Sequence, residues 1–169
     1  MPAVAETARW FIVILFLAIL AVASISDIRD RRIPNWTVLA IAILFLPWAF
    51  LGPNTLLSAL GAAVAAFLIS VPLYFFRVVG AGDSKLLTVA ALFVGSAQLL
   101  HFLVLVGLAG GAVAVGSLLL RPTRGLVMLQ LRGKGDFGRG VPYGVAIAIG
   151  AACEVAWPLV RQAWGTGNI

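Results

Sequence analysis

The chain has 169 residues, of which 62% are hydrophobic and 11% are charged, with a net charge of +6. Soluble domains contain about 45–50% apolar and about 25% charged residues, so this composition excludes a soluble protein. It indicates one integral-membrane domain over residues 1–169. The charges lie in short segments between apolar spans, which excludes nucleic acid as the partner and indicates lipid headgroups. The single cysteine, Cys153, excludes an intrachain disulfide and a four-cysteine zinc site.

The hydrophobic pattern predicts an all-α, polytopic membrane protein with about six spanning helices. The fourth apolar run has only nine residues, which is short for a hydrocarbon core of about 30 Å. Between the last two runs, five basic residues surround the apolar residues 126–131, and this pattern predicts a segment lying on the headgroups. The predicted spans are residues 10–26, 36–51, 56–76, 86–94, 99–120 and 141–160.

The basic residues predict the orientation of these helices. The first, third and fifth connections between the predicted spans hold three, two and five of the 12 Lys and Arg residues, and the other two connections hold none. Because positive loops stay in the cytoplasm, these three connections are predicted to be cytoplasmic and both termini periplasmic.

Two carboxylates then fall at the same depth, on the cytoplasmic side. Asp27 ends the first span, and Asp83 follows two glycines, Gly80 and Gly82, just before the fourth. Two carboxylates a few ångströms apart share one proton. That is the device of aspartic proteases, in which the ionised acid activates water and the protonated one polarises the scissile carbonyl. Glycines at this position would let an extended substrate backbone come close to Asp83.

Other interpretations of the two acids remain open. Asp83 is also suited to be a helix N-cap, and Asp27 to end its helix while pairing with Arg31. A small transporter or channel subunit would use the same acids to relay protons or bind a cation, but it would favour midplane acids and an internal repeat, and the sequence has neither. A non-enzymatic assembly scaffold would tolerate conservative changes at both acids. No Ser–His–Asp set or metal cluster is visible, since His101 is the only histidine.

Four features in order carry a family resemblance: Asp27, Ile33-Pro34-Asn35, Gly80-Ala81-Gly82-Asp83 and Val141-Pro142-Tyr143-Gly144. Together they resemble the type IV prepilin peptidases, membrane aspartic peptidases with a GxGD motif, and most closely the short form of tight-adherence (Flp) pilus systems.

The resemblance implies that Asp27 and Asp83 are the catalytic pair, with no metal or organic cofactor. It implies cleavage of the leader of prepilins and pseudopilins at the cytoplasmic face of the bacterial inner membrane. Longer members also methylate the new N-terminus and carry a cytoplasmic insert, often with a four-cysteine zinc site. This chain has one cysteine and no such insert, so methyltransferase activity is not expected.

Five further residues are assigned to the motifs around the two acids. Pro34 ends the preceding helix and Asn35 is predicted to cap the next one. Lys85 is predicted to anchor the membrane boundary beside the acids, with its charged end among the headgroups. Pro142 and Tyr143 are predicted to begin the last helix, where the Tyr hydroxyl can bond at the interface.

The remaining polar and small residues are expected to be structural. Gly107 and Gly111 have the four-residue spacing of close helix packing. His101 is expected at the membrane interface, and Glu154 is expected to pack or lie at the interface in the half of the membrane away from the two acids. Asp30 is expected to be a solvated acid.

Overall fold

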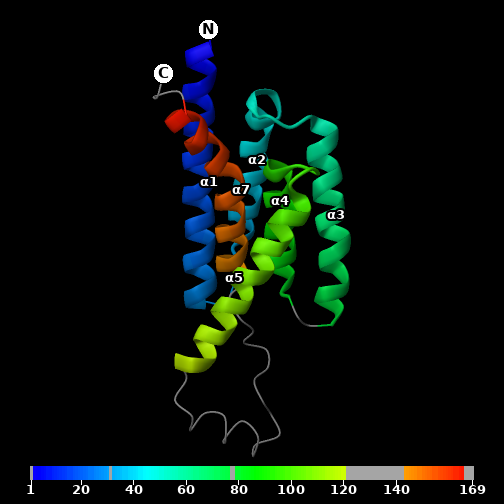
Figure 1. Cartoon of the computed structure of the whole chain (residues 1–169). Coiled ribbons are helices and arrows are strands. Elements are labelled where there is room, and N and C mark those ends of the chain that lie inside the picture. The colour runs from blue at the N-terminus through cyan, green and yellow to red at the C-terminus, as the bar shows by residue number, and fades with distance from the viewer. Residues whose placement is uncertain (1, 31, 77–78, 121–142, 166–169) are drawn as a thin grey trace, which may run out of the picture.

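A computed structural model describes residues 2–30, 32–76, 79–120 and 143–165. Within these ranges the chain is all helical, with no strand, as the hydrophobic pattern predicts (Figure 1). The predicted headgroup segment at residues 126–131 lies outside the described residues. The helices are α1 (Pro2–Asp30), α2 (Asn35–Leu51), α3 (Leu56–Phe75), α4 (Ala81–Val94), α5 (Leu99–Leu120) and α7 (Tyr143–Gly165).

The helices confirm a polytopic membrane protein. Four segments are long and apolar enough to cross a membrane: Val4–Asp30, Leu56–Phe75, Leu99–Gly116 and Tyr143–Arg161. The helix α2 is apolar but shorter. The 14 residues of α4 reach only about 21 Å at the helical rise, less than a hydrocarbon core of about 30 Å.

The first helix is longer than the predicted span at both ends. It starts at Pro2 and continues to Asp30, so Asp27 lies in its last turn and does not follow the helix. This difference matters for the site, because a side chain in a helical turn has a fixed direction. The alternative pairing of Asp27 with Arg31 involves a residue outside the described ranges.

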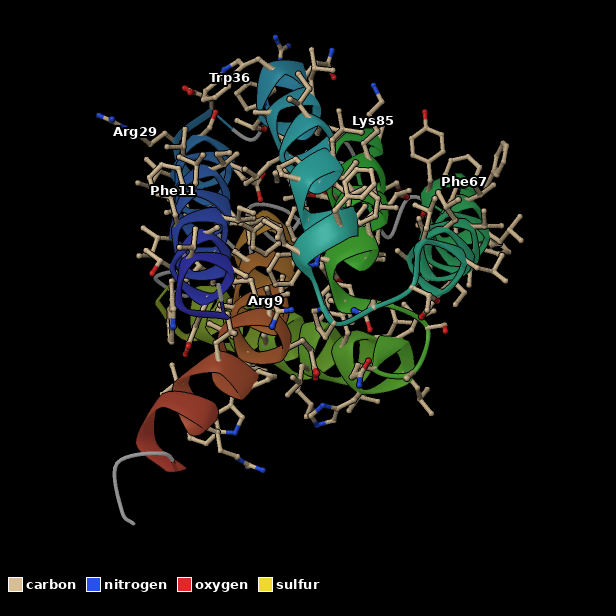
Figure 2. The ribbon with its side chains drawn as sticks, turned by 90° about the horizontal axis from the view of Figure 1, so that it is seen from above. Arg9, Phe11, Arg29, Trp36, Phe67 and Lys85 are labelled. Carbon is tan, nitrogen blue, oxygen red and sulfur yellow. The ribbon has the colours of Figure 1, made fainter. Side chains whose placement is uncertain are left out.

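The short helix α4 lies at the centre of the bundle and packs against α2, α3, α5 and α7, whereas α3 stands at the edge (Figures 1 and 2). An aromatic cluster joins α4 to its neighbours. The Phe93 ring stacks on Phe16 of α1 with 4.3 Å between centroids and on Trp48 of α2 with 5.6 Å. Such pairs add to the burial of large apolar surfaces, so the cluster fixes α4 between α1 and α2.

Close packing between α5 and α7 uses different glycines from those predicted. Gly107 and Gly111 face outward, and a Cβ at either would meet nothing within 4 Å. Gly110 instead lies against the Tyr143 ring, where a Cβ would be 3.0 Å from Cε1, and Gly150 lies against α5. The prediction at Gly107 and Gly111 is therefore wrong for contacts within this chain. A four-residue spacing identifies a shared helix face but not what that face contacts.

Candidate active site

Asp27 is held at the junction of α1 and α7. Its side chain is buried, with 6% exposure, and its Oδ2 accepts a hydrogen bond of 2.9 Å from the backbone N–H of Gly144. A Cβ on Gly144 would lie 2.9 Å from the same oxygen, so only glycine lets the amide approach this closely. First-turn N–H groups of a helix have no partner within the helix and favour a negative charge. The start of α7 therefore holds the Asp27 carboxylate in place.

Asp83 lies in the first turn of α4 and is 9% exposed. Gly80 is the N-cap residue, and its N–H donates to Asp83 Oδ2 at 3.1 Å. The alternative that Asp83 is itself the N-cap is thus wrong by three positions, although its carboxylate does help to close the helix start. The other oxygen, Oδ1, is buried and has no hydrogen-bond partner among the described residues. Asp83 therefore keeps one oxygen for a further interaction.

The two acids line one pocket of about 340 Å³, although 56 positions separate them in sequence. We call it the aspartate pocket. It lies between the end of α1, the connection to α2 and the start of α4. Four other predicted site residues, Gly80, Gly82, Asn35 and Lys85, line it as well, together with Arg32, Ile33 and Ala81.

The pKa of Asp83 is raised to about 6, chiefly by burial, because the charged form loses its hydration. The charge of Asp27 also contributes to this rise, and the bond from the Gly80 N–H opposes it. Asp83 precedes the apolar residues of α4 and lies outside the helices long enough to span a membrane. The pair can therefore hold one proton in a pH range where an ordinary Asp is fully ionised.

The glycines of the motif make room for protein atoms. A Cβ on Gly82 would lie 3.2 Å from Cβ of Ile33, in the connection between α1 and α2. A Cβ on Gly80 would lie 3.0 Å from Asp83 Oδ2. The backbone at Gly80 has φ −75° and ψ 158°, which other residues adopt readily. Space is thus the reason for glycine here, and approach of a substrate backbone stays a prediction.

Sequence comparison assigns the family. A model of the type IV leader peptidase family matches residues 14–115, more than half of the chain, including both aspartates. The chain belongs to this family. It is therefore a leader-peptidase-like protease with a membrane-spanning helical fold. No curated protein and no solved structure matches the sequence.

In this peptidase, Lys85 and Asn35 connect two walls of the pocket. The Lys85 Nζ donates to Asn35 Oδ1 at 3.3 Å, which joins the start of α4 to the start of α2. Asn35 is the first residue of α2 and the N-cap position is Pro34, which has no side-chain cap. The prediction that Asn35 caps this helix is wrong, because its side chain is directed to Lys85. Thr37 Oγ1 instead donates to the Pro34 carbonyl at 2.7 Å.

The last motif contributes to the peptidase site through a residue that the sequence interpretation missed. Tyr143 begins α7 as predicted, but its ring lies against Gly110 and not in the pocket. Pro142 lies outside the described residues. Gly144 holds Asp27, yet it was quoted in the motif without a role. Its position in the first turn of a predicted helix, where N–H groups need acceptors, was the signal available.

Arg32 was also missed, and Ile33 was quoted in its motif without a role, because loop residues carry no periodic signal that relates them to a distant glycine. In the described part of the peptidase, no group of three or more His, Cys, Asp or Glu side chains gathers as a metal site requires.

Proposed function

We propose that the protein is an aspartic endopeptidase that uses Asp27 and Asp83 to remove the leader from type IV prepilins and pseudopilins of the Flp class. The observation that carries this proposal is the shared aspartate pocket, in which two buried acids from distant parts of the sequence meet. Two desolvated like charges are costly to hold together. In a membrane peptidase this arrangement is useful, because the two acids then share one proton at the reacting centre.

The surroundings of the two acids support different roles. Asp27 accepts a hydrogen bond from the Gly144 N–H at the start of α7 through its Oδ2, so this oxygen acts as an acceptor. Asp83 has a pKa raised to about 6 and a buried Oδ1 without a partner in the described chain. We therefore assign Asp27 as the base and Asp83 as the acid.

Both acids take part in each step of the proposed hydrolysis. Asp27 takes a proton from water as the water oxygen bonds to the scissile carbonyl carbon, while the Asp83 hydroxyl donates its proton to the carbonyl oxygen. The tetrahedral intermediate returns that proton to Asp83 as the carbonyl reforms. The C–N bond breaks, and Asp27 gives its proton to the leaving amine nitrogen.

The position of the pocket suits a prepilin. Such a substrate has a basic leader followed by a long apolar helix, so its cleavage point lies at the membrane boundary. The aspartate pocket lies at the bundle end that carries Arg29, Arg32 and Lys85, and the positive-inside rule supports a cytoplasmic location in the bacterial inner membrane. No cofactor is needed for this chemistry, and we do not expect methyl transfer to the new N-terminus.

The proposal is tested by cleavage of a candidate Flp-type prepilin co-expressed with the wild type, Asp27→Asn or Asp83→Asn. Asparagine keeps the size of the side chain but cannot exchange a proton as the carboxylic acid does. We expect each change to lower processing by roughly 10²–10⁴-fold, the range for a lost general acid or base.

Asp30→Asn is the matched control, because Asp30 is an exposed acid three residues after Asp27 in the same helix. It should process like the wild type, with membrane levels of all variants checked by immunoblot. Wild-type processing by either pocket variant would contradict the two-aspartate mechanism and favour a scaffold or transporter.

A further inference from the structure

A second pocket, of about 290 Å³, lies at the other end of the bundle. We call it the distal pocket. Arg9 on one wall precedes Asp27 by 18 positions in the same helix, which corresponds to about 27 Å along the axis. This separation is close to the thickness of the hydrocarbon core, about 30 Å. When the aspartate pocket is at one membrane boundary, the distal pocket therefore opens near the opposite one.

The distal pocket exists because α4 is short. Its last residues, Phe93 and Val94, line the pocket, and α1 continues beyond them in Figure 1. The pocket wall at this point is held firmly by Asn54, whose Nδ2 donates to the Phe93 carbonyl at 3.2 Å and the Val94 carbonyl at 2.9 Å. Gly95 then turns with φ +79°, and a Cβ there would meet the Asn54 side chain at 2.6 Å. This recess is thus a built feature of the fold.

Two groups of opposite charge line this recess. The Nε of Arg9 donates to the Leu51 carbonyl, and Arg9 lines the pocket. Glu154 of α7, only 8% exposed, is paired with Nδ1 of His101, which is 70% exposed. No ion pair joins Arg9 to Glu154 in the described part of the chain. In Figure 2, Arg9 lies over the interior of the bundle end, whereas Arg29 points away from the bundle.

Separated opposite charges across one pocket suit a ligand that carries both charges. A guanidinium presents a planar set of donors that matches phosphate oxygens. The Glu154 carboxylate pairs with His101 through Oε1, and a carboxylate has further lone pairs that can accept from an ammonium. Trp48 lines the pocket too, and its buried Nε1 has no partner among the described residues.

We propose that the distal pocket binds an ammonium–phosphate zwitterion, the chemistry of a phosphoethanolamine headgroup, with Arg9 at the phosphate and Glu154 at the ammonium. The depth of the pocket at the membrane boundary favours a lipid as the source over a water-soluble compound. The volume of about 290 Å³ is at the lower end of small-ligand sites, about 300–1,000 Å³. This site is separate from the proposed peptidase chemistry and does not depend on it.

The test is lipid retention by the full-length protein, measured by native mass spectrometry. Purified protein is equilibrated in micelles with equimolar phosphatidylethanolamine, phosphatidylcholine and phosphatidylglycerol. We expect phosphatidylethanolamine to be retained about tenfold more than the others, the factor that one charge-assisted hydrogen bond supports. Phosphatidylcholine has no ammonium N–H to donate to Glu154, and phosphatidylglycerol has no cation.

Two variants and two matched controls identify the site. Arg9→Gln and Glu154→Gln should each abolish the preference for phosphatidylethanolamine. Arg29→Gln and Glu6→Gln make the same charge changes at exposed positions of α1 and should keep it. Prepilin cleavage and thermal melting of each variant show whether it is folded.

Equal retention of the three lipids by the wild type would overturn the proposal, as would an unchanged preference in folded Arg9→Gln and Glu154→Gln proteins. A parallel arm uses glycerophosphoethanolamine without lipid to separate the two sources. Failure of the free compound to bind, with lipid retained, supports a lipid source. Arg9-dependent binding of the free compound in lipid-depleted protein supports the zwitterion site with a soluble source.

Discussion

The two ends of the bundle hold charge in opposite ways. At the aspartate pocket, two acids of like charge share one pocket, and the backbone N–H groups of Gly80 and Gly144 donate hydrogen bonds to them. At the distal pocket, charges of opposite sign face one recess, and Arg9 and Glu154 each have a partner elsewhere in the chain. Like charges lead to a shared proton, whereas separated opposite charges leave room for a ligand. The same helix, α1, contributes to both ends.

The largest expected effect is the change of prepilin cleavage with pH, which tests the shared proton at the aspartate pocket. Because the acid role needs protonated Asp83, with its pKa raised to about 6, kcat/KM for prepilin cleavage should fall as pH rises through about 6. The slope should approach tenfold per pH unit, so activity at pH 8 should be about 100-fold below the plateau. The measurement is peptide cleavage by purified enzyme between pH 4 and 9. An activity that is flat across pH 6 would exclude the assigned acid role.

The next effect concerns the amide that holds Asp27. Gly144→Ala places a Cβ 2.9 Å from Asp27 Oδ2, so the carboxylate must shift and its hydrogen bond weakens. We expect kcat to fall about tenfold or more, the effect of disturbing one bond to a charged group. Gly107→Ala is the control, since a Cβ there meets nothing within 4 Å. Equal activity of the two variants would show that Gly144 does not position Asp27.

A smaller effect distinguishes two explanations for glycine at position 82, namely space for Ile33 and approach of a substrate backbone. Gly82→Ala brings a Cβ to 3.2 Å from Ile33, and we expect kcat/KM to fall a few-fold because the pocket wall must shift by tenths of an ångström. Adding Ile33→Gly should restore activity, since it removes the Cβ that the new methyl group meets at 3.2 Å. If the second change gives no recovery, the glycine serves the approach of the substrate backbone instead.

The smallest effect is expected at the bond between Lys85 and Asn35. Lys85 is exposed and its bond to Asn35 measures 3.3 Å, so its contribution should be below about 1 kcal/mol. Lys85→Gln should lower kcat/KM by less than about fivefold, measured with the same peptide. A loss near that of Asp83→Asn would instead mean that Lys85 takes part in the chemistry.

Much of the fold was predictable because hydrophobic runs and loop charges are local signals. They give an all-α membrane protein, and the order of the spans places Asp27 and Asp83 at one end. The length of α1 was underestimated, since its polar last turn around Asp27 is helical without being apolar.

Contacts between distant positions were not predictable in this way. The amide of Gly144 reaches Asp27 across 117 positions, and His101 meets Glu154 across 53. No local pattern encodes which helix faces pair. This is also why the sequence pattern predicted close helix packing at Gly107 and Gly111 and not at Gly110. The distal pocket depends on such a pairing, together with the short length of α4.

The central claim is that Asp27 and Asp83 act as one catalytic unit, and the most direct test is a double-mutant cycle on prepilin cleavage by purified enzyme. Residues that act as a unit have non-additive effects. The account predicts that the Asp27→Asn/Asp83→Asn protein retains about the same residual kcat as either single variant. A double variant whose loss equals the product of the two single losses would contradict it, because the two acids would then act independently.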